Sequence, residues 1–231
     1  DTLVGIFAIG EKPGGDKDPF ALRRAALSVL RIIVENRLNV DIAELCRLAA
    51  DGYPQELQAD AAIDAVIEYI FDRQKAYYQE QGIQFDVVDA VAQDHPGSLH
   101  DCDLRIRALQ EFQGHESALA LAAANKRIAN ILRKQSYSPM EIVPELLQEA
   151  AEVQLYQQIR AIDSEVVELF AQSKYLPGLE LLAQLRPAVD RFFDDVMVMV
   201  DDPALQNNRL ALLDELLQSF RRVADLSRIQ S

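Results

Sequence analysis

Residues 118–135, with the sequence ALALAAANKRIANILRKQ, combine a high alanine content with a helical spacing of larger apolar side chains. Residues three, four and seven positions apart share one face of a helix. On that spacing, the face expected to point inward holds Leu121, Ile128, Ile131 and Leu132. The other face is expected to hold Lys126, Asn130, Arg133 and Lys134. This stretch therefore predicts a helix that carries a narrow basic strip.

The same periodicity extends through the rest of the chain. The helices that it predicts cover about 20–35, 41–50, 57–81, 86–94, 101–112, 116–134, 140–170, 175–184, 187–200 and 205–229. Asp18 and Pro19 are expected to start the first of these, as N-cap and first helical residue. Because no alternating apolar and polar run predicts a strand, we expect an all-α fold, a multi-helix array that ends in a helical bundle.

Two breaks divide the predicted helices. The clearest is the glycine-rich loop at 10–18, and the second is the turn at 95–100. We therefore expect a short segment at 1–15, a helical linker region at 16–97 and a helical module at 98–231. The chain opens on apolar residues without an initiator Met, which predicts that it is a piece of a longer protein.

The charge of the chain reverses locally. The 231 residues carry a formal net charge of -14, yet the segments 19–50 and 101–135 are net basic. The first includes Arg23 and Arg24, and the second includes the basic strip. An acidic protein can bind RNA when its cations gather on one face, because affinity follows local contacts with phosphates. The alternative interpretation is that these cations lie on ordinary solvent-exposed helix faces and bind no ligand.

No pattern in the chain predicts catalysis or metal binding. Cys46 and Cys102 have no paired spacing and are expected to be reduced, buried thiols. The histidines lie in or beside a turn, where ligand spacing for zinc is missing, so no metal is expected. The loop at 10–17 lacks the order of glycines and lysine found in a P-loop, which favours a structural turn. No nucleophile has a recognisable base, and we predict no catalytic residue.

Neither a membrane segment nor a signal peptide is predicted. No apolar run approaches the roughly 18 to 20 residues that cross a bilayer. The first residues also lack the cationic start of a secretory signal. These features favour a cytoplasmic protein with no membrane partner.

Several long blocks resemble one protein family, the β subunits of bacterial glycyl-tRNA synthetases. The blocks occur in order along the chain at 1–10, 12–13, 15–26, 122–132, 192–202, 208–213 and 222–227. They include AAANKRIANIL at 122–132 and FFDDVMVMVDD at 192–202. The resemblance implies that this chain is roughly the C-terminal third of such a subunit.

The resemblance also implies a division of labour. In a heterotetramer, the α subunits would carry the class II catalytic core that joins glycine to tRNA with ATP and magnesium, and the β subunits would position tRNA-Gly. The helical module at 98–231 would be an anticodon-binding domain similar to that of arginyl-tRNA synthetases. Residues 1–10 would be the last helix of an HD-like domain whose metal ligands are absent here. The chain itself would hold no cofactor and be non-catalytic.

RNA-binding roles follow for individual side chains. Asn125 and Asn130 suit base edges, and the residues suited to phosphates are Lys126, Arg127, Arg133 and Lys134. Arg23 and Arg24 are expected to form a companion basic region. Arg127 has an alternative role, anchoring its helix through an internal salt bridge. The alternative function for the whole chain is a helical assembly module that docks an α subunit or the second β subunit without touching RNA.

Overall fold

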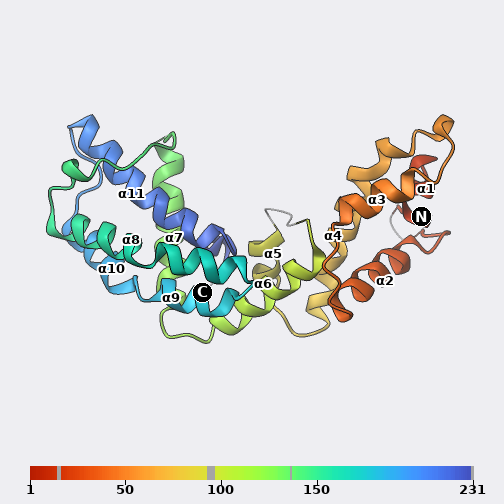
Figure 1. Ribbon diagram of the computed structural model, residues 1–231, viewed down its shortest axis with the longest axis horizontal. Coiled ribbons are helices and arrows are strands. Elements are labelled where there is room, and N and C mark those ends of the chain that lie inside the picture. Colours follow the sequence, from red (N-terminus) through yellow and green to blue (C-terminus); the bar gives the residue numbers. More distant parts are fainter. Residues whose placement is uncertain (15–16, 93–96, 136, 230–231) are drawn as a thin grey trace. The chain divides into compact units, whose positions relative to one another are not determined.

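The computed structural model describes residues 1–14, 17–92, 97–135 and 137–229 (Figure 1). Across these ranges the regular structure is helical, and no strand occurs in them beyond one isolated bridge between Gly14 and Lys17. The prediction of an all-α fold is confirmed. Backbone contacts divide the chain into two compact units, an N-terminal unit at Asp1–Ile106 and a C-terminal unit at Arg107–Ser231.

The N-terminal unit is built around α4. Its elements are α1 (Thr2–Ala8), α2 (Leu22–Glu35), α3 (Ile42–Ala50), η1 (Gln55–Leu57), η2 (Ala59–Ala62), α4 (Ile63–Gln79), α5 (Phe85–Ala92) and the first part of α6 (Leu99–Phe112). Helix α4 packs against α1, α2, α3 and α5. Its buried face includes Ile70 and Tyr78, both of which are almost fully covered. The unit therefore has a hydrophobic core of its own.

The start of α2 differs from the prediction. Pro19 lies in a turn, and α2 begins at Leu22 after Ala21, whose φ is 54°. Asp18 still caps the helix, because its carboxylate accepts hydrogen bonds from the backbone nitrogens of Leu22 and Arg23 at 2.8 and 3.0 Å. Desolvation acts to raise the pKa of Asp18, but these hydrogen bonds and the nearby charges of Arg23 and Arg24 together outweigh it and lower the pKa. The N-cap position of α2 is therefore Ala21 and not Asp18 as predicted, and the first helical residue is Leu22 and not Pro19.

The C-terminal unit packs its helices around α11. Its elements are the end of α6, α7 (Ala118–Lys134), η3 (Pro144–Leu146), α8 (Ala150–Ala171), α9 (Tyr175–Ala183), α10 (Arg186–Asp195), α11 (Pro203–Arg221) and η4 (Leu226–Arg228). Helix α11 packs against α7, α8 and α9, while η4 covers α7 and α10 packs on α8. Leu212 and Phe220 of α11 are fully buried, as is Ile128 of α7.

Several helix boundaries were predicted wrongly, each for a local reason. The predicted helix at 57–81 begins only at Ile63, because Gln58 adopts a left-handed conformation with φ of 49°. The predicted helix at 140–170 begins at Ala150, where Glu149 and Glu152 form a capping box. The final helix begins at Pro203 and not at 205, because Asp202 caps it through the backbone nitrogen of Ala204 at 2.9 Å.

Two further helices end earlier than predicted. Helix α10 ends at Asp195 instead of continuing to about 200, and α11 ends at Arg221 instead of about 229. After α10, the backbone oxygen of Met197 accepts a hydrogen bond from Arg209, which draws the chain away from a helical path. After α11, the Asp225 carboxylate accepts from Ser227 and supports the short turn η4.

The expected segment boundaries also differ from the observed units. Residues 1–15 were expected to be separate from a linker at 16–97, yet α1 packs on α2 and α4, and its residues Leu3 and Val4 are buried. The contact-based division falls inside α6, between Ile106 and Arg107, and not at 97/98. His95 and the end of the predicted helix at 86–94 lie outside the described residues.

Candidate nucleic-acid interface

The exposed face of α7 carries the predicted Lys126, Asn130, Arg133 and Lys134, and Arg127 is exposed beside them. We call these five residues the basic strip. Its four cations are exposed and Asn130 is half-buried. The helix contains no Asp or Glu between residues 118 and 134. On the opposite face, Leu121 and Ile128 are buried as predicted, whereas Ile131 and Leu132 are only half-covered. The amphipathic pattern of this stretch thus places the charges outward.

Asn125 corrects the predicted set of base-reading residues. Its side chain is 1% exposed, and its Nδ2 donates a hydrogen bond to the backbone oxygen of Leu121 at 2.9 Å. Leu121 lies four positions before it and Ile128 three positions after it, so all three share the buried face. The prediction that Asn125 meets a base edge is therefore wrong, because the folded helix turns this amide into the bundle.

Asn130 and Arg133 form a polar pair on the exposed face. Arg133 Nη2 donates to Asn130 Oδ1 at 3.0 Å. This contact leaves the Asn130 amide nitrogen as a donor and holds the Arg133 guanidinium close to the helix surface. Among the described residues, no cation of the basic strip forms a salt bridge with a carboxylate. The strip can therefore receive an anionic ligand without first breaking an ion pair.

Arg127 is held by an aromatic ring. The central carbon of its guanidinium lies 4.0 Å from the ring centroid of Phe193, on the neighbouring helix α10. The sequence left open an internal salt bridge for Arg127, and the structure shows a cation–π contact in that role. The sequence signal for this contact was weak, since residues 127 and 193 are distant along the chain.

Arg23 and Arg24 lie in the N-terminal unit, on the first turn of α2. Arg24 is exposed, while Arg23 is half-buried and donates its backbone N–H to Asp18. They belong to a different unit from the basic strip. We therefore treat them as a separate candidate site.

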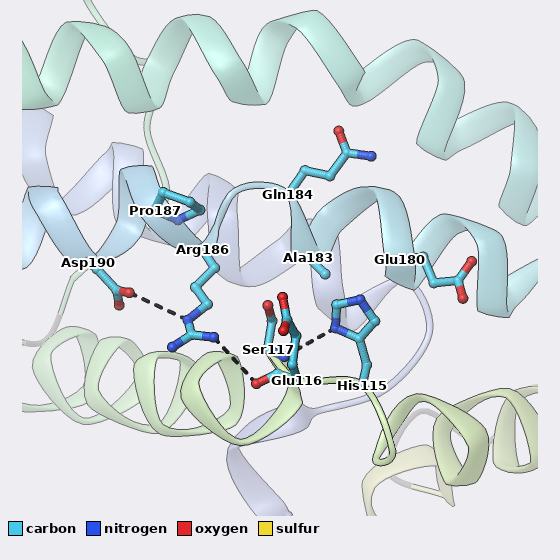
Figure 2. A pocket seen from close by; sticks show the side chains of 9 residues that line it. All are labelled: His115, Glu116, Ser117, Glu180, Ala183, Gln184, Arg186, Pro187 and Asp190. Carbon is cyan, nitrogen blue, oxygen red and sulfur yellow. Dashed lines mark hydrogen bonds and ion pairs between the residues drawn. The ribbon is translucent and has the colours of Figure 1, made fainter.

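A polar pocket of about 650 Å³ lies beside the start of α7, between the turn after α6 and the junction of α9 with α10 (Figure 2). Arg186 spans it, with Nη1 donating to the Glu116 backbone oxygen at 3.3 Å and Nε 3.6 Å from Asp190 Oδ2. His115 Nδ1 accepts from the backbone nitrogen of Ser117 at 3.1 Å. Its lining residues are His115, Glu116, Ser117, Glu180, Ala183, Gln184, Arg186, Pro187 and Asp190.

The charge of this pocket is unlike that of the basic strip. Glu116, Glu180 and Asp190 provide three carboxylates against the single guanidinium of Arg186. Such a lining repels phosphate and favours ligands with amino groups. The pocket has no signal in the sequence, because its walls come from segments that are separated along the chain and carry no common motif.

Both cysteines lie in the interior of the protein. Cys46 and Cys102 are free and buried, as predicted, and burial raises the pKa of Cys102 to about 12. Within the described ranges, no three His, Cys, Asp or Glu residues group in a way that could hold a metal ion. In the same ranges, no helix combines the length and the apolar character needed to cross a bilayer.

Comparison with known proteins identifies the family. Residues 1–93 match the family described as glycyl-tRNA synthetase beta subunit, and residues 121–230 match the DALR anticodon binding domain. Over all 231 residues, the chain is 48% identical to the glycine–tRNA ligase beta subunit of Shewanella denitrificans and 49% identical to that of Shewanella sp. strain ANA-3. The chain belongs to the glycyl-tRNA synthetase β-subunit family. The resemblance seen in the sequence is confirmed.

The basic strip lies within the part of the chain that matches an anticodon-binding domain. The chain spans about a third of the length of these curated relatives, covering 33% and 34% of them. The region similar to the DALR anticodon binding domain begins at residue 121 and includes the basic strip and helices α8 to α11. The helical C-terminal unit and the region of that match coincide over most of their length.

Proposed function

We propose that the exposed face of α7 binds the anticodon loop of tRNA-Gly, within the β subunit of glycine–tRNA ligase. The observation that carries this proposal is an acid-free helix with four exposed cations, none of them in a salt bridge within the described residues, inside a region similar to an anticodon-binding domain. The chain itself is non-catalytic and holds no cofactor. It positions tRNA in the cytoplasm for an α subunit that uses ATP with magnesium, and a second β subunit completes the heterotetramer.

The geometry of the basic strip suits a single-stranded loop. Lys126 and Lys134 are exposed point charges that fit phosphates, whereas the Asn130 amide can bond to a base edge. Unstacked bases in a loop present such edges, unlike the bases of an A-form stem. The chain as a whole is acidic, with a formal net charge of -14, which opposes non-specific binding. Arg23 and Arg24 would contact the RNA at a second point.

A salt series tests the phosphate contacts. We expect the logarithm of the affinity of the chain for tRNA-Gly to fall linearly with the logarithm of the salt concentration. The double variant Lys126→Gln with Lys134→Gln should reduce the magnitude of that slope by about 1.4, at about 0.7 for each lost phosphate contact. The matched control is Lys174→Gln, an exposed lysine of the same unit outside the basic strip. An unchanged slope in the double variant, with the fold retained, would contradict the proposed site.

A second candidate function is assembly, favoured by apolar side chains on the surface of the N-terminal unit. Leu48 of α3 is 63% exposed, Leu45 is 38% exposed and Ile32 of α2 is 56% exposed. Such side chains mark protein interfaces when they gather in a patch. If they dock an α subunit, the chain should capture that subunit without RNA, and Leu48→Glu should abolish capture while leaving tRNA affinity unchanged. Equal capture by the variant would count against this surface.

A further inference from the structure

Arg127 and Phe193 form a stacked pair on the surface of the C-terminal unit, which we call the platform. The guanidinium carbon lies 4.0 Å from the ring centroid, which is close contact for a cation–π pair. Phe193 in turn contacts Phe192 edge-to-face, with centroids 5.7 Å apart and planes at 82°. Phe192 is fully buried. The ring that supports Arg127 is therefore anchored to the core of the bundle.

The remaining surface of the guanidinium is available to a ligand. Arg127 is exposed, and no carboxylate pairs with it among the residues that the structure describes. Other surface arginines of the same unit differ in this respect, since Arg191 and Arg222 pair with Asp195 and Asp163. Because the ring occupies one side of Arg127, a planar ligand can stack on the other side. A planar cation fixed in this way loses little conformational entropy when it is covered.

We propose that Arg127, supported by Phe193, is the stacking platform for one unstacked base of the bound RNA loop. The inference rests on the proposed function and assigns Arg127 a role that differs from that of the phosphate-binding lysines. Bases of single-stranded RNA stack on guanidinium planes as they do on aromatic rings. Asn130 lies three residues further along the same face of α7, where its amide can meet the edge of the stacked base.

The platform predicts that arginine and lysine are not interchangeable at position 127. A lysine keeps the positive charge but has no plane on which a base can stack. We expect Arg127→Lys to weaken binding of a tRNA-Gly anticodon stem-loop by about ten-fold, the loss associated with one stacked base. The salt slope should stay unchanged, because the charge is retained. The control Lys174→Arg, at an exposed position of the same unit outside the basic strip, should leave the affinity close to that of the wild type.

Abasic substitution identifies the partner of the platform. Loop nucleotides are replaced by abasic ones in turn, and each RNA is titrated against the wild type and Arg127→Lys. One abasic position should weaken the wild type by about ten-fold and bring it level with the variant, because both then lack the same stack. If the variant binds the intact loop as tightly as the wild type does, or if its deficit persists at every abasic position, the platform is overturned.

Further variants separate this inference from the proposed function and from folding. Phe193→Tyr keeps the supporting ring and should bind like the wild type, whereas Phe193→Leu should resemble Arg127→Lys. Because residue 127 is exposed, Arg127→Lys should keep the wild-type melting temperature. This variant therefore tests the platform even if Phe193→Leu fails to fold. Absence of salt-dependent binding by the wild type would overturn the proposed function together with the platform. Salt-dependent binding with no effect of Arg127→Lys would overturn the platform alone.

Discussion

Arg209 binds Glu152 inside the C-terminal unit through a buried salt bridge, with the two residues 4% and 0% exposed. The other oxygen of Glu152 accepts from the backbone nitrogens of Gln148 and Glu149 at 2.9 and 2.7 Å. Arg209 also donates to the Met197 backbone oxygen at 2.7 Å. Through this ion pair and the hydrogen bond to Met197, Arg209 connects the middle of α11 to the start of α8 and to the loop after α10. Helix α11 in turn packs against α7.

Removing one partner of this pair should strongly destabilise the protein. Arg209→Leu leaves the Glu152 charge buried without its cation, and we expect a loss of about 3 to 5 kcal/mol in the free energy of unfolding. The contrasting variant is Arg222→Leu, whose partner Asp163 is 2.9 Å away on the surface, and it should cost about 1 kcal/mol or less. Urea unfolding followed by circular dichroism measures both, and equal losses would contradict the distinction.

Asn125 should matter for stability and not for RNA. Asn125→Ala removes the hydrogen bond to the Leu121 backbone oxygen, so we expect a loss of about 1 kcal/mol in unfolding free energy. Because the amide is buried, affinity for the anticodon stem-loop should be unchanged below the melting temperature. Asn130→Ala is the matched variant on the exposed face, and it should weaken binding with little effect on stability. Weaker RNA binding by a fully folded Asn125→Ala would restore the base-edge role predicted from the sequence.

The Asp18 cap should make the N-terminal unit sensitive to acid. The pKa of Asp18 is lowered in the folded chain from its ordinary value of 3.8, so the folded state prefers the charged carboxylate. Its stabilising contribution is therefore complete above that value and is lost as the pH falls through the lower folded pKa. The difference in melting temperature between the wild type and Asp18→Ala should be constant near neutral pH and shrink below about pH 4. Asp72→Ala, at an exposed position of α4, should show no such pattern.

Gly178 should not tolerate a larger side chain. It lies in α9, where an added Cβ would overlap the ring of Phe170 at the end of α8. We expect Gly178→Ala to cost about 1 to 3 kcal/mol through overpacking. Gly52→Ala is a suitable control, because the nearest atom to its added Cβ is at 3.4 Å. Adding Phe170→Leu should recover part of the loss. A variant as stable as the wild type would show that α8 and α9 can separate without cost.

Local signals predicted the helices better than their ends. The helix predicted at 41–50 agrees with α3 because its start is set locally, by Asp41 accepting hydrogen bonds from the backbone nitrogens of Ala43 and Glu44. The prediction of a continuous helix from 140 was wrong. The helical apolar pattern includes residues 140–149, but part of this segment is held in a non-helical conformation by a distant side chain. There, the Asn208 side chain holds the backbone nitrogen and oxygen of Val143 at 2.7 and 3.1 Å. A contact between residues so far apart leaves no periodic trace in the sequence.

The sequence by itself determined the helical class of the protein, the family to which it belongs and the outward basic strip of α7. These properties follow from helical periodicity and from ordered blocks of residues, both of which are written along the chain. Only the tertiary structure decided that Arg127 rests on Phe193 and that Glu152 meets Arg209. Each of these depends on how helices turn and pack against one another, and side-chain partners across a bundle are selected by packing and not by spacing in the sequence.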